Sequence, residues 1–294
     1  MMPLLQSLFD AVSAGAVYAL AALAIGLVFG VLRLANFAIG EIITGSAYAL
    51  ILIWPFSWPL ALVASVVVAV ALSLLMDAAV FRWMRSQSPA TLLIASFGLS
   101  ILLQRTYDGI FGTNVRTASV APALTTSVTI GGLRINLLAV VAVVLAVCLL
   151  VGVGLFLSQT RVGLQVQAAA ADFRIARILG IRSGVVISLT FVISGVLAAA
   201  VAFVLTARSG AVDPTFGVQA TLFGLIGAVI GGLNRLGGAV VGGFAVGFVL
   251  SLFTAWLPGG LNDFRTAFVY LLVIVVLVIV PNGVFAGRTL KERA

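Results

Sequence analysis

The sequence predicts an all-α polytopic membrane protein, a bundle of about eight or nine transmembrane helices joined mostly by short loops. Of its 294 residues, 63% are hydrophobic and only 8% are charged. A soluble domain averages about 45–50% apolar and about 25% charged residues, and a chain of about 300 residues cannot hide so much apolar surface from water. Mostly apolar segments of about 20 residues, long enough to cross a bilayer, also recur along the chain. We therefore expect a single transmembrane domain over residues 1–294.

The apolar segments can be followed in order along the chain. Six are clear candidates for spans: Phe9–Leu32, Pro59–Val80, Thr91–Phe111, Asn136–Ser158, Val185–Ala207 and Arg265–Val280. Three are less regular: Asn36–Ile53, Gly217–Gly232 and Gly237–Trp256. The 8 prolines fall at segment ends or in loops, where a missing N–H does little harm. A helix over 217–232 would cover only about 24 Å, so we expect this segment to be broken or re-entrant.

The basic residues predict the orientation in the membrane. If the N-terminus lies outside, eleven of the 16 Lys and Arg residues fall on one side and five on the other. The larger group comprises Arg33, Arg82, Arg85, Arg161, Arg174, Arg177, Arg182, Arg235, Arg288, Lys291 and Arg293. Cytoplasmic loops carry the excess of basic residues, so this side is expected to be the cytoplasm, and the C-terminus lies there too. The positive charge then indicates topology and not a nucleic-acid partner.

Two loops between the spans are long enough to carry structure of their own. The external loop 112–135 is rich in Thr, Ser and Gly, and Thr125–Ile130 could pair as a short hairpin around Gly131 and Gly132. The cytoplasmic loop 159–184 predicts a helix over Gln165–Leu179, because it is rich in Ala, lacks Pro and is followed by Gly180 at the position of a C-cap.

This predicted cytoplasmic helix is amphipathic. Its apolar face is formed by Leu164, Ala168, Ala171, Ile175 and Ile178, which recur at spacings of three and four. The polar side chains of Gln167, Arg174 and Arg177 point elsewhere. Because the helix is too short and too sparsely apolar to span, its apolar face must lie on the membrane surface, on the chain itself or on a partner protein.

The composition excludes several kinds of chemistry. The chain has no His and a single Cys, Cys148, so His/Cys zinc sites, His-ligated haem, iron–sulfur clusters and structural disulfides are not expected. Its single Lys is Lys291, so it holds no Walker-A loop, and any ATP would be bound and hydrolysed by a partner subunit. With no nucleophile–base set either, we expect no catalytic residue, no metal site and no cofactor in this chain.

Four segments carry a resemblance to a known family. QAAAADFRIARILGI (Gln167–Ile181) resembles the cytoplasmic coupling segment of permease subunits of bacterial ABC importers, in the form found in the branched-chain amino-acid group. GAVYALAALAIGLVFGVLRLANFAIGEIITGSAYAL (Gly15–Leu50) looks like the N-terminal region of that family. GLIGAVIGGLNRLGGAVVGG (Gly224–Gly243) looks like its glycine-rich stretch, and LVIVPNGVFAGR (Leu277–Arg288) like its end. The four run in order over nearly the whole chain, which looks more like the shorter of the two paired permeases.

The resemblance implies a multi-pass protein of the bacterial inner membrane and a mechanism. Two permease chains, of which the second is expected to be a paralogue, form a pathway. Two ATP-binding cassette subunits dock beneath it, and an external binding protein delivers the solute. The implied solute is a branched-chain or other hydrophobic amino acid. The chain departs from the family pattern at Ile39 (often His), Ala171 (often Glu) and Asn234–Leu236 (usually small residues and Pro), which leaves urea, short amides or other amino acids as alternatives.

On this interpretation, the cytoplasmic helix enters a groove on the ATP-binding subunit and acts as a rigid lever between the adjoining spans. The docking face comprises Ala168, Ala171, Ile175, Ile178 and Leu179, and the helix ends at Gly180. Asp172, Arg174 and Arg177 would supply rim contacts, which are worth little individually.

Polar residues within the apolar segments are candidates for the translocation path, because charges at membrane depth cost at least about 2.5–3.5 kcal/mol each. Glu41, Asn36 and Thr44 either line a polar part of the path or hold a broken segment together. The alternative is that Glu41 is a solvated acid at the cytoplasmic end, paired with Arg33. The glycine-dense stretch around Gly224–Gly247 adds Gln219, Thr221 and Asn234 as polar members of a kinked element near the path.

An ion-coupled secondary carrier, acting alone, is the alternative from a different class. Such carriers generally need acids deep in the membrane or unwound backbone carbonyls. The spans offer Glu41 and Asp77, and both are expected near the cytoplasmic side. The energy source therefore discriminates between the two: ATP with partner subunits, or an ion gradient with the lone chain.

Overall fold

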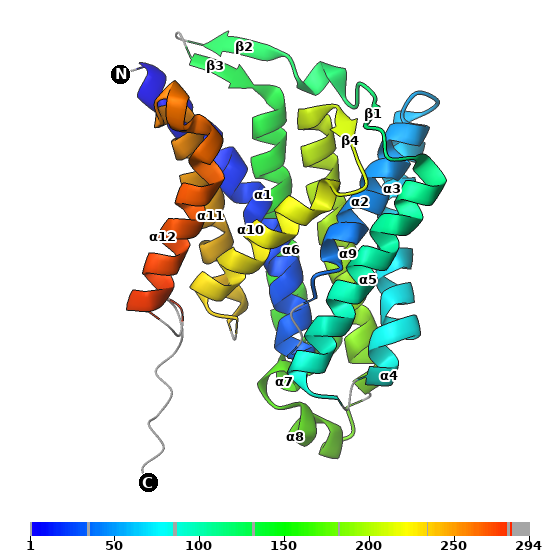
Figure 1. Ribbon diagram of the computed structural model, residues 1–294. Coiled ribbons are helices and arrows are strands. Elements are labelled where there is room, and N and C mark those ends of the chain that lie inside the picture. Colours follow the sequence, from blue (N-terminus) through cyan, green and yellow to red (C-terminus); the bar gives the residue numbers. More distant parts are fainter. Residues whose placement is uncertain are drawn as a thin grey trace.

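The computed structural model describes residues 2–33, 36–84, 87–130, 133–181, 183–233, 235–280 and 283. Most of its long helices run roughly along one direction while α10 lies obliquely to them, with a β-hairpin at one end of the bundle and two short helices at the other (Figure 1). The helices are α1 (Met2–Leu32), α2 (Ile39–Ile53), α3 (Trp58–Met76), α4 (Arg82–Met84), α5 (Pro89–Phe111), α6 (Leu137–Gln159), α7 (Arg161–Ala171), α8 (Phe173–Ile178), α9 (Ser183–Ser209), α10 (Phe216–Gly231), α11 (Leu236–Trp256) and α12 (Arg265–Ile279). A π-helical segment, Asp77–Phe81, joins α3 to α4, and 3₁₀ turns occupy Pro122–Leu124 and Gly259–Phe264.

The predicted fold class is confirmed. Within the described residues, seven helical stretches are long and apolar enough to cross a membrane, and α2 and α10 are shorter apolar helices. Each of the nine predicted spans coincides with one of these helices. The segment expected to be broken, 217–232, is instead a continuous helix, α10, of 16 residues. It is short because it begins after Asp213 and Pro214 and ends at Gly232, whose φ of +96° is a left-handed conformation that stops a helix.

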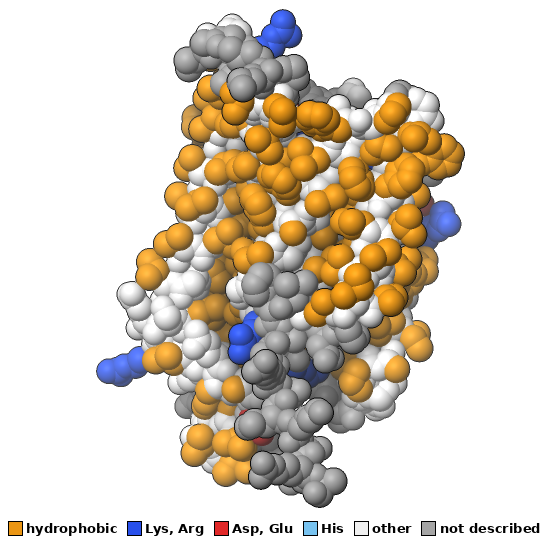
Figure 2. Space-filling model, turned by 90° about the vertical axis from the view of Figure 1, so that its left-hand side faces the viewer, with side chains coloured by type: hydrophobic (Ala, Val, Ile, Leu, Met, Phe, Trp, Pro, Cys, Tyr) orange, Lys and Arg blue, Asp and Glu red, His pale blue; other side chains and the backbone are white. Residues whose placement is uncertain are grey.

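The core of the bundle lies around α1 and α9, which are largely buried, while α5, α6 and α12 expose most of their surface. Figure 2, which views the side where α12 lies, shows hydrophobic side chains over much of the height of the molecule and few charged ones. Such a surface suits hydrocarbon, since a helix bundle in lipid need not hide apolar groups.

Small residues allow the helices at the core to approach closely. A Cβ atom on Gly243 of α11 would lie 2.6 Å from the Tyr18 carbonyl oxygen of α1. One on Gly231 of α10 would collide with the Gly238 carbonyl of α11. These glycines bring backbone against backbone, so that α11 packs closely on α1 and α10 packs closely on α11.

The hydrogen-bonded strands all lie at the end opposite α7 and α8 (Figure 1). Strand β2 (Ser127–Ile130) pairs antiparallel with β3 (Leu133–Asn136), which confirms the predicted hairpin in the loop 112–135. Strands β1 (Arg116–Thr117) and β4 (Ala211–Val212) also pair antiparallel, joining the loops that follow α5 and α9. The two loops predicted for opposite sides of the membrane therefore lie at opposite ends of the bundle.

Candidate functional site

The two short helices α2 and α10 cross within their first turns. Gly40 and Gly217 lie at this crossing with their backbones in contact, so that a Cβ atom on Gly217 would overlap the Gly40 carbonyl. The Thr44 hydroxyl accepts a hydrogen bond from the Gly217 N–H at 2.9 Å and donates one to the Gly40 carbonyl at 3.0 Å. The hydroxyl of α2 thus satisfies one of the free N–H groups at the start of α10.

The two helices begin with the same pattern of residues. Asn36, Gly40 and Thr44 recur at the spacing of Asp213, Gly217 and Thr221. The Asn36 Oδ1 accepts from the Ala38 N–H at 3.0 Å, and the Asp213 Oδ1 accepts from the Thr215 N–H at 2.8 Å. Each threonine donates to the carbonyl of its own glycine, at 3.1 Å in α10.

The two halves of this repeat have opposite directions. Helix α2 follows the end of α1 that lies beside α7, whereas α10 follows β4 at the hairpin end of the bundle (Figure 1). The crossing is therefore a small inverted repeat, in which two helix N-termini meet inside the bundle.

Glu41 lies beside this crossing and is fully buried, with 0% of its surface exposed. Its Oε1 accepts hydrogen bonds from the Ser100 hydroxyl and the Gln104 amide, both at 2.9 Å, and Oε2 has no hydrogen-bond partner among the described residues. The Tyr107 hydroxyl donates to the Glu41 carbonyl at 2.7 Å. The interpretation of Glu41 as a solvated acid paired with Arg33 is therefore wrong, because α5 covers the first turn of α2.

The α5 residues that contact this site were not predicted from the sequence. Ser96 accepts from the Phe37 N–H at 3.3 Å, and Ser100, Gln104 and Tyr107 follow at spacings of four, four and three. Polar residues at these spacings lie on one face of a helix. A stripe of polar residues on one face of an otherwise apolar span could have identified these residues from the sequence.

A cavity of about 300 Å³ lies between α5 and α10, next to Glu41. It is lined by Phe37, Phe97, Ser100, Ile101, Gln104, Thr215, Val218, Thr221 and Leu222. The rings of Phe37 and Phe97 meet edge to face, with 5.1 Å between their centroids. The cavity thus combines apolar walls with a few polar groups, as sites for amphipathic small molecules commonly do.

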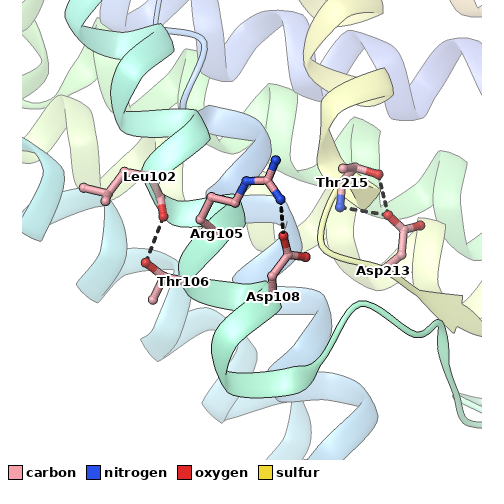
Figure 3. A network of polar contacts seen from close by, with 6 residues as sticks. All are labelled: Leu102, Arg105, Thr106, Asp108, Asp213 and Thr215. Atoms are coloured by element: carbon pink, nitrogen blue, oxygen red, sulfur yellow. Dashed lines mark hydrogen bonds and ion pairs between the residues drawn. The ribbon is translucent and has the colours of Figure 1, made fainter.

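The charged residues near this cavity come from α5 and from the segment before α10 (Figure 3). The Arg105 guanidinium pairs with the Asp108 carboxylate at 3.1 Å. Asp213 and Thr215, which are bonded to each other, lie across from this pair in Figure 3. Because Arg105 is largely exposed, its pair with Asp108 contributes little to stability.

The structure brings together four of the six predicted path residues. Asn36, Glu41, Thr44 and Thr221 are all buried around the α2–α10 crossing. Gln219 lies apart from them, in a cleft of about 840 Å³ that Tyr18, Arg208 and Arg265 also line. Asn234 is outside the described residues.

The coupling segment, which we define as residues 161–181, differs from its prediction as a single helix over 165–179. It forms two helices, α7 and α8, separated at Asp172, whose backbone is extended with φ −149° and ψ 104°. The Asp172 Oδ1 accepts from the Ile175 N–H at 2.9 Å, which caps the start of α8. The single-helix prediction is wrong because this cap outweighs the helix propensity of the preceding Ala run. Asp172 therefore caps α8, a structural role that is separate from its predicted contact at the rim of the docking face.

One face of the coupling segment packs on the bundle. Gly163, Val166 and Ala169 are buried, and a Cβ atom on Gly163 would overlap the Phe156 carbonyl at the end of α6. The Thr160 hydroxyl accepts from the Gly163 N–H at 2.9 Å and fixes the start of α7. Helix α7 is therefore firmly held against α6.

The predicted docking face is not used within this chain. Ile175, Ile178 and Leu179 are 55%, 77% and 75% exposed, and Leu164, Ala168 and Ala171 are exposed as well. Gly180, with φ +85°, ends α8 in the left-handed conformation predicted for it. The side chains of Arg174 and Arg177 are outside the described part of the structure.

The sequence is similar to those of known transport permeases. Residues 7–280 match the family described as "Branched-chain amino acid transport system / permease component". The chain is 30% identical to the high-affinity branched-chain amino acid transport system permease protein BraD of Pseudomonas aeruginosa, over 98% of this chain and 97% of that protein. It is 29% identical, with the same coverage, to the corresponding permease protein LivH of Escherichia coli. A shorter match, 33% identical over 36% of this chain and 31% of the relative, is to the fructose import permease protein FruF of Bifidobacterium longum.

Proposed function

The chain belongs to the family of branched-chain amino acid transport permeases, and from this membership we propose that it is the translocating subunit of an ATP-driven importer. The observation that carries the proposal is the exposed apolar face of the coupling segment, at the end of the bundle opposite the hairpin. A membrane protein presents such a face to lipid or to a partner, and the match over residues 7–280 favours ATP-binding cassette subunits as the partner.

In the proposed complex, the coupling segment transmits a conformational change of the partner subunit to the membrane spans. Gly163 holds α7 against α6, so α7 cannot shift without moving the end of that span. Ile175, Ile178 and Leu179 are presented to the partner on and just after α8. If a groove on the ATP-binding subunit binds these side chains, closure of the ATP-binding subunits moves α6 and α9, the spans on either side of the coupling segment.

The cavity between α5 and α10 suits the proposed solute. Phe97, Ile101 and Leu222 would contact an apolar side chain, while Ser100 and Gln104 would bond the polar groups. This supports a branched-chain or other hydrophobic amino acid over urea or a short amide, which offers no apolar side chain. A second permease chain would complete the pathway, and an external binding protein would deliver the solute at the hairpin end.

Affinity purification from native membranes in mild detergent tests the proposed assembly. The expected co-purifying proteins are ATPases with a Walker-A loop, a second permease and an external solute-binding protein. Repeated recovery of the chain without an ATPase, under conditions that keep a known importer intact, would overturn the assembly.

An ion-coupled carrier remains the alternative function, and the buried carboxyl of Glu41 is the observation that favours it. Carriers of this kind place acids inside the bundle for ion coupling. In the importer, Glu41 instead holds α5 to α2 through Ser100 and Gln104.

Replacing Glu41 separates these two roles. Glu41→Gln keeps an oxygen that accepts from both donors, so an importer carrying it is expected to retain uptake within about threefold. Glu41→Ala leaves two buried donors unsatisfied, which is expected to destabilise the protein by about 1–3 kcal/mol for each donor. Thermal unfolding and solute uptake of both variants provide the measurement. Complete loss of uptake in a stable Glu41→Gln protein would contradict the structural role and support ion coupling.

A further inference from the structure

The cleft of about 840 Å³ that contains Gln219 lies among α1, α9, α10, α11 and α12. Its charged lining residues are Arg208 at the end of α9, Asp213 just before α10 and Arg265 at the start of α12. The ends of these elements lie toward the hairpin end of the bundle (Figure 1). Charged side chains at membrane depth generally face a water-filled cavity, so we expect this cleft to hold water.

The two arginines face the same part of the cleft. Both guanidinium groups act electrostatically on the Tyr18 hydroxyl, and Tyr18 lies about 24 Å along α1 from its start at Met2. Neither arginine side chain forms an ion pair or a hydrogen bond within the described part of the chain. Guanidinium groups bind carboxylates well because their planar donors match the two oxygens. The arginines therefore supply donors for an anionic group on a ligand that enters from the hairpin end.

Asp213 adds the opposite charge to the same cleft. Its Oδ1 accepts hydrogen bonds from the Thr215 N–H at 2.8 Å and from the Thr215 hydroxyl. Its Oδ2 has no hydrogen bond or ion pair with any described residue, so one carboxylate oxygen is left for an ammonium group. Two cations and one anion in a single cleft are complementary to a zwitterion that carries a carboxylate and an ammonium group.

The cleft shares a wall with the cavity between α5 and α10. Thr215, Val218 and Leu222, at the start of α10, line both spaces. The described residues that line the cavity are all uncharged, whereas the cleft holds three charged side chains. The groups that distinguish an amino acid from an uncharged solute therefore lie in the cleft, on the hairpin side of α10.

We propose that this cleft is a first binding position for the solute. Arg208 and Arg265 bind the α-carboxylate of an amino acid, Asp213 binds its α-ammonium group, and Val218 and Leu222 contact its apolar side chain. The class of solute rests on the proposed function, but binding in the cleft does not depend on the energy source. Urea and short amides carry neither charge and would not be held there.

Binding is measured on the purified full chain in nanodiscs, without ATP or any transport assay. Radiolabelled leucine is titrated to saturation, so that the loss of a site and a lowered affinity are both detected. Leucinamide, which lacks the carboxylate, and 4-methylpentanoate, which lacks the ammonium group, are the competing ligands. Each is expected to bind at least about tenfold more weakly than leucine, because one charge-assisted interaction is lost.

The double variant Arg208→Gln/Arg265→Gln is expected to bind leucine at least about tenfold more weakly and no better than leucinamide. Asp213→Asn keeps the acceptor for Thr215 and is expected to lose only the discrimination against 4-methylpentanoate. Arg208→Lys/Arg265→Lys keeps both charges and is expected to retain most of the preference for leucine. Arg134→Gln is the matched control and should leave binding unchanged, because Arg134 is an exposed arginine on the hairpin that does not line the cleft.

Unchanged leucine binding by a folded double Gln variant would overturn the proposal, as would equal binding of leucine and leucinamide by the unaltered chain, or no leucine binding at all. Leucine binding in phosphatidylcholine nanodiscs that disappears in phosphatidylglycerol would assign the arginines to lipid phosphate and also overturn it. Failure of the proposed function is seen separately. A chain that purifies without an ATPase yet shows these ligand preferences would overturn the proposed assembly and leave the assignment of the cleft intact.

Discussion

Gly217→Ala is expected to abolish uptake, although alanine normally stabilises a helix relative to glycine. The added Cβ would overlap the Gly40 carbonyl, and neither backbone can retreat without separating α2 from α10. Overpacking of this kind costs about 1–3 kcal/mol, and the displaced α10 would also lose its bond to the Thr44 hydroxyl. Thermal unfolding of the purified protein and solute uptake by cells measure the two effects.

Gly98→Ala is the matched control for this prediction. Gly98 lies within α5, and a Cβ atom there would have nothing within 4 Å. The same chemical change is therefore expected to leave stability and uptake unchanged or slightly raised. If Gly217→Ala behaved like Gly98→Ala, the close crossing of α2 and α10 would be contradicted.

Replacing both Ile175 and Ile178 with Asp is expected to reduce ATP-driven uptake by at least about tenfold while the protein still folds. Both side chains are more than half exposed, so the change costs little within the chain itself. In the proposed complex it places two carboxylates in the apolar groove of the ATP-binding subunit, which would have to desolvate them. Uptake and co-purified ATPase are measured in the same preparation.

Ile175→Leu with Ile178→Leu is the control for docking, because it preserves an apolar face of the same size. It is expected to keep most of the uptake and all of the co-purified ATPase. Normal uptake by the Asp variant, or equal loss in both variants, would show that this face does not dock on the ATPase.

The spans could be predicted from the sequence because each depends on a local property, the length of an apolar run. The hairpin in the loop 112–135 could also be predicted, since its two strands are adjacent in the chain. The pairing of β1 with β4 could not be predicted, because each strand has only two residues and the two strands are distant in sequence. Sequence alone gives no signal for so short a contact.

The candidate site was predicted only in part because its features are tertiary. The burial of Glu41 depends on Ser100 and Gln104, which α5 brings over the start of α2. The break at Asp172 depends on a competition between a side-chain cap and an Ala-rich helix, and helical periodicity does not reveal its outcome. The repeat of Asn36, Gly40 and Thr44 in a second segment was present in the sequence, but its meaning appears only when the two helices cross.

We propose that ATP hydrolysis by partner subunits, and not an ion gradient, drives transport through this chain. The most direct measurement is uptake of radiolabelled leucine into liposomes containing either the purified complex or the chain alone. The predicted result is uptake by the complex only when ATP and the external binding protein are both supplied, with no effect of a proton or sodium gradient. Uptake by the chain alone, driven by an ion gradient without ATP, would contradict the account and establish a secondary carrier.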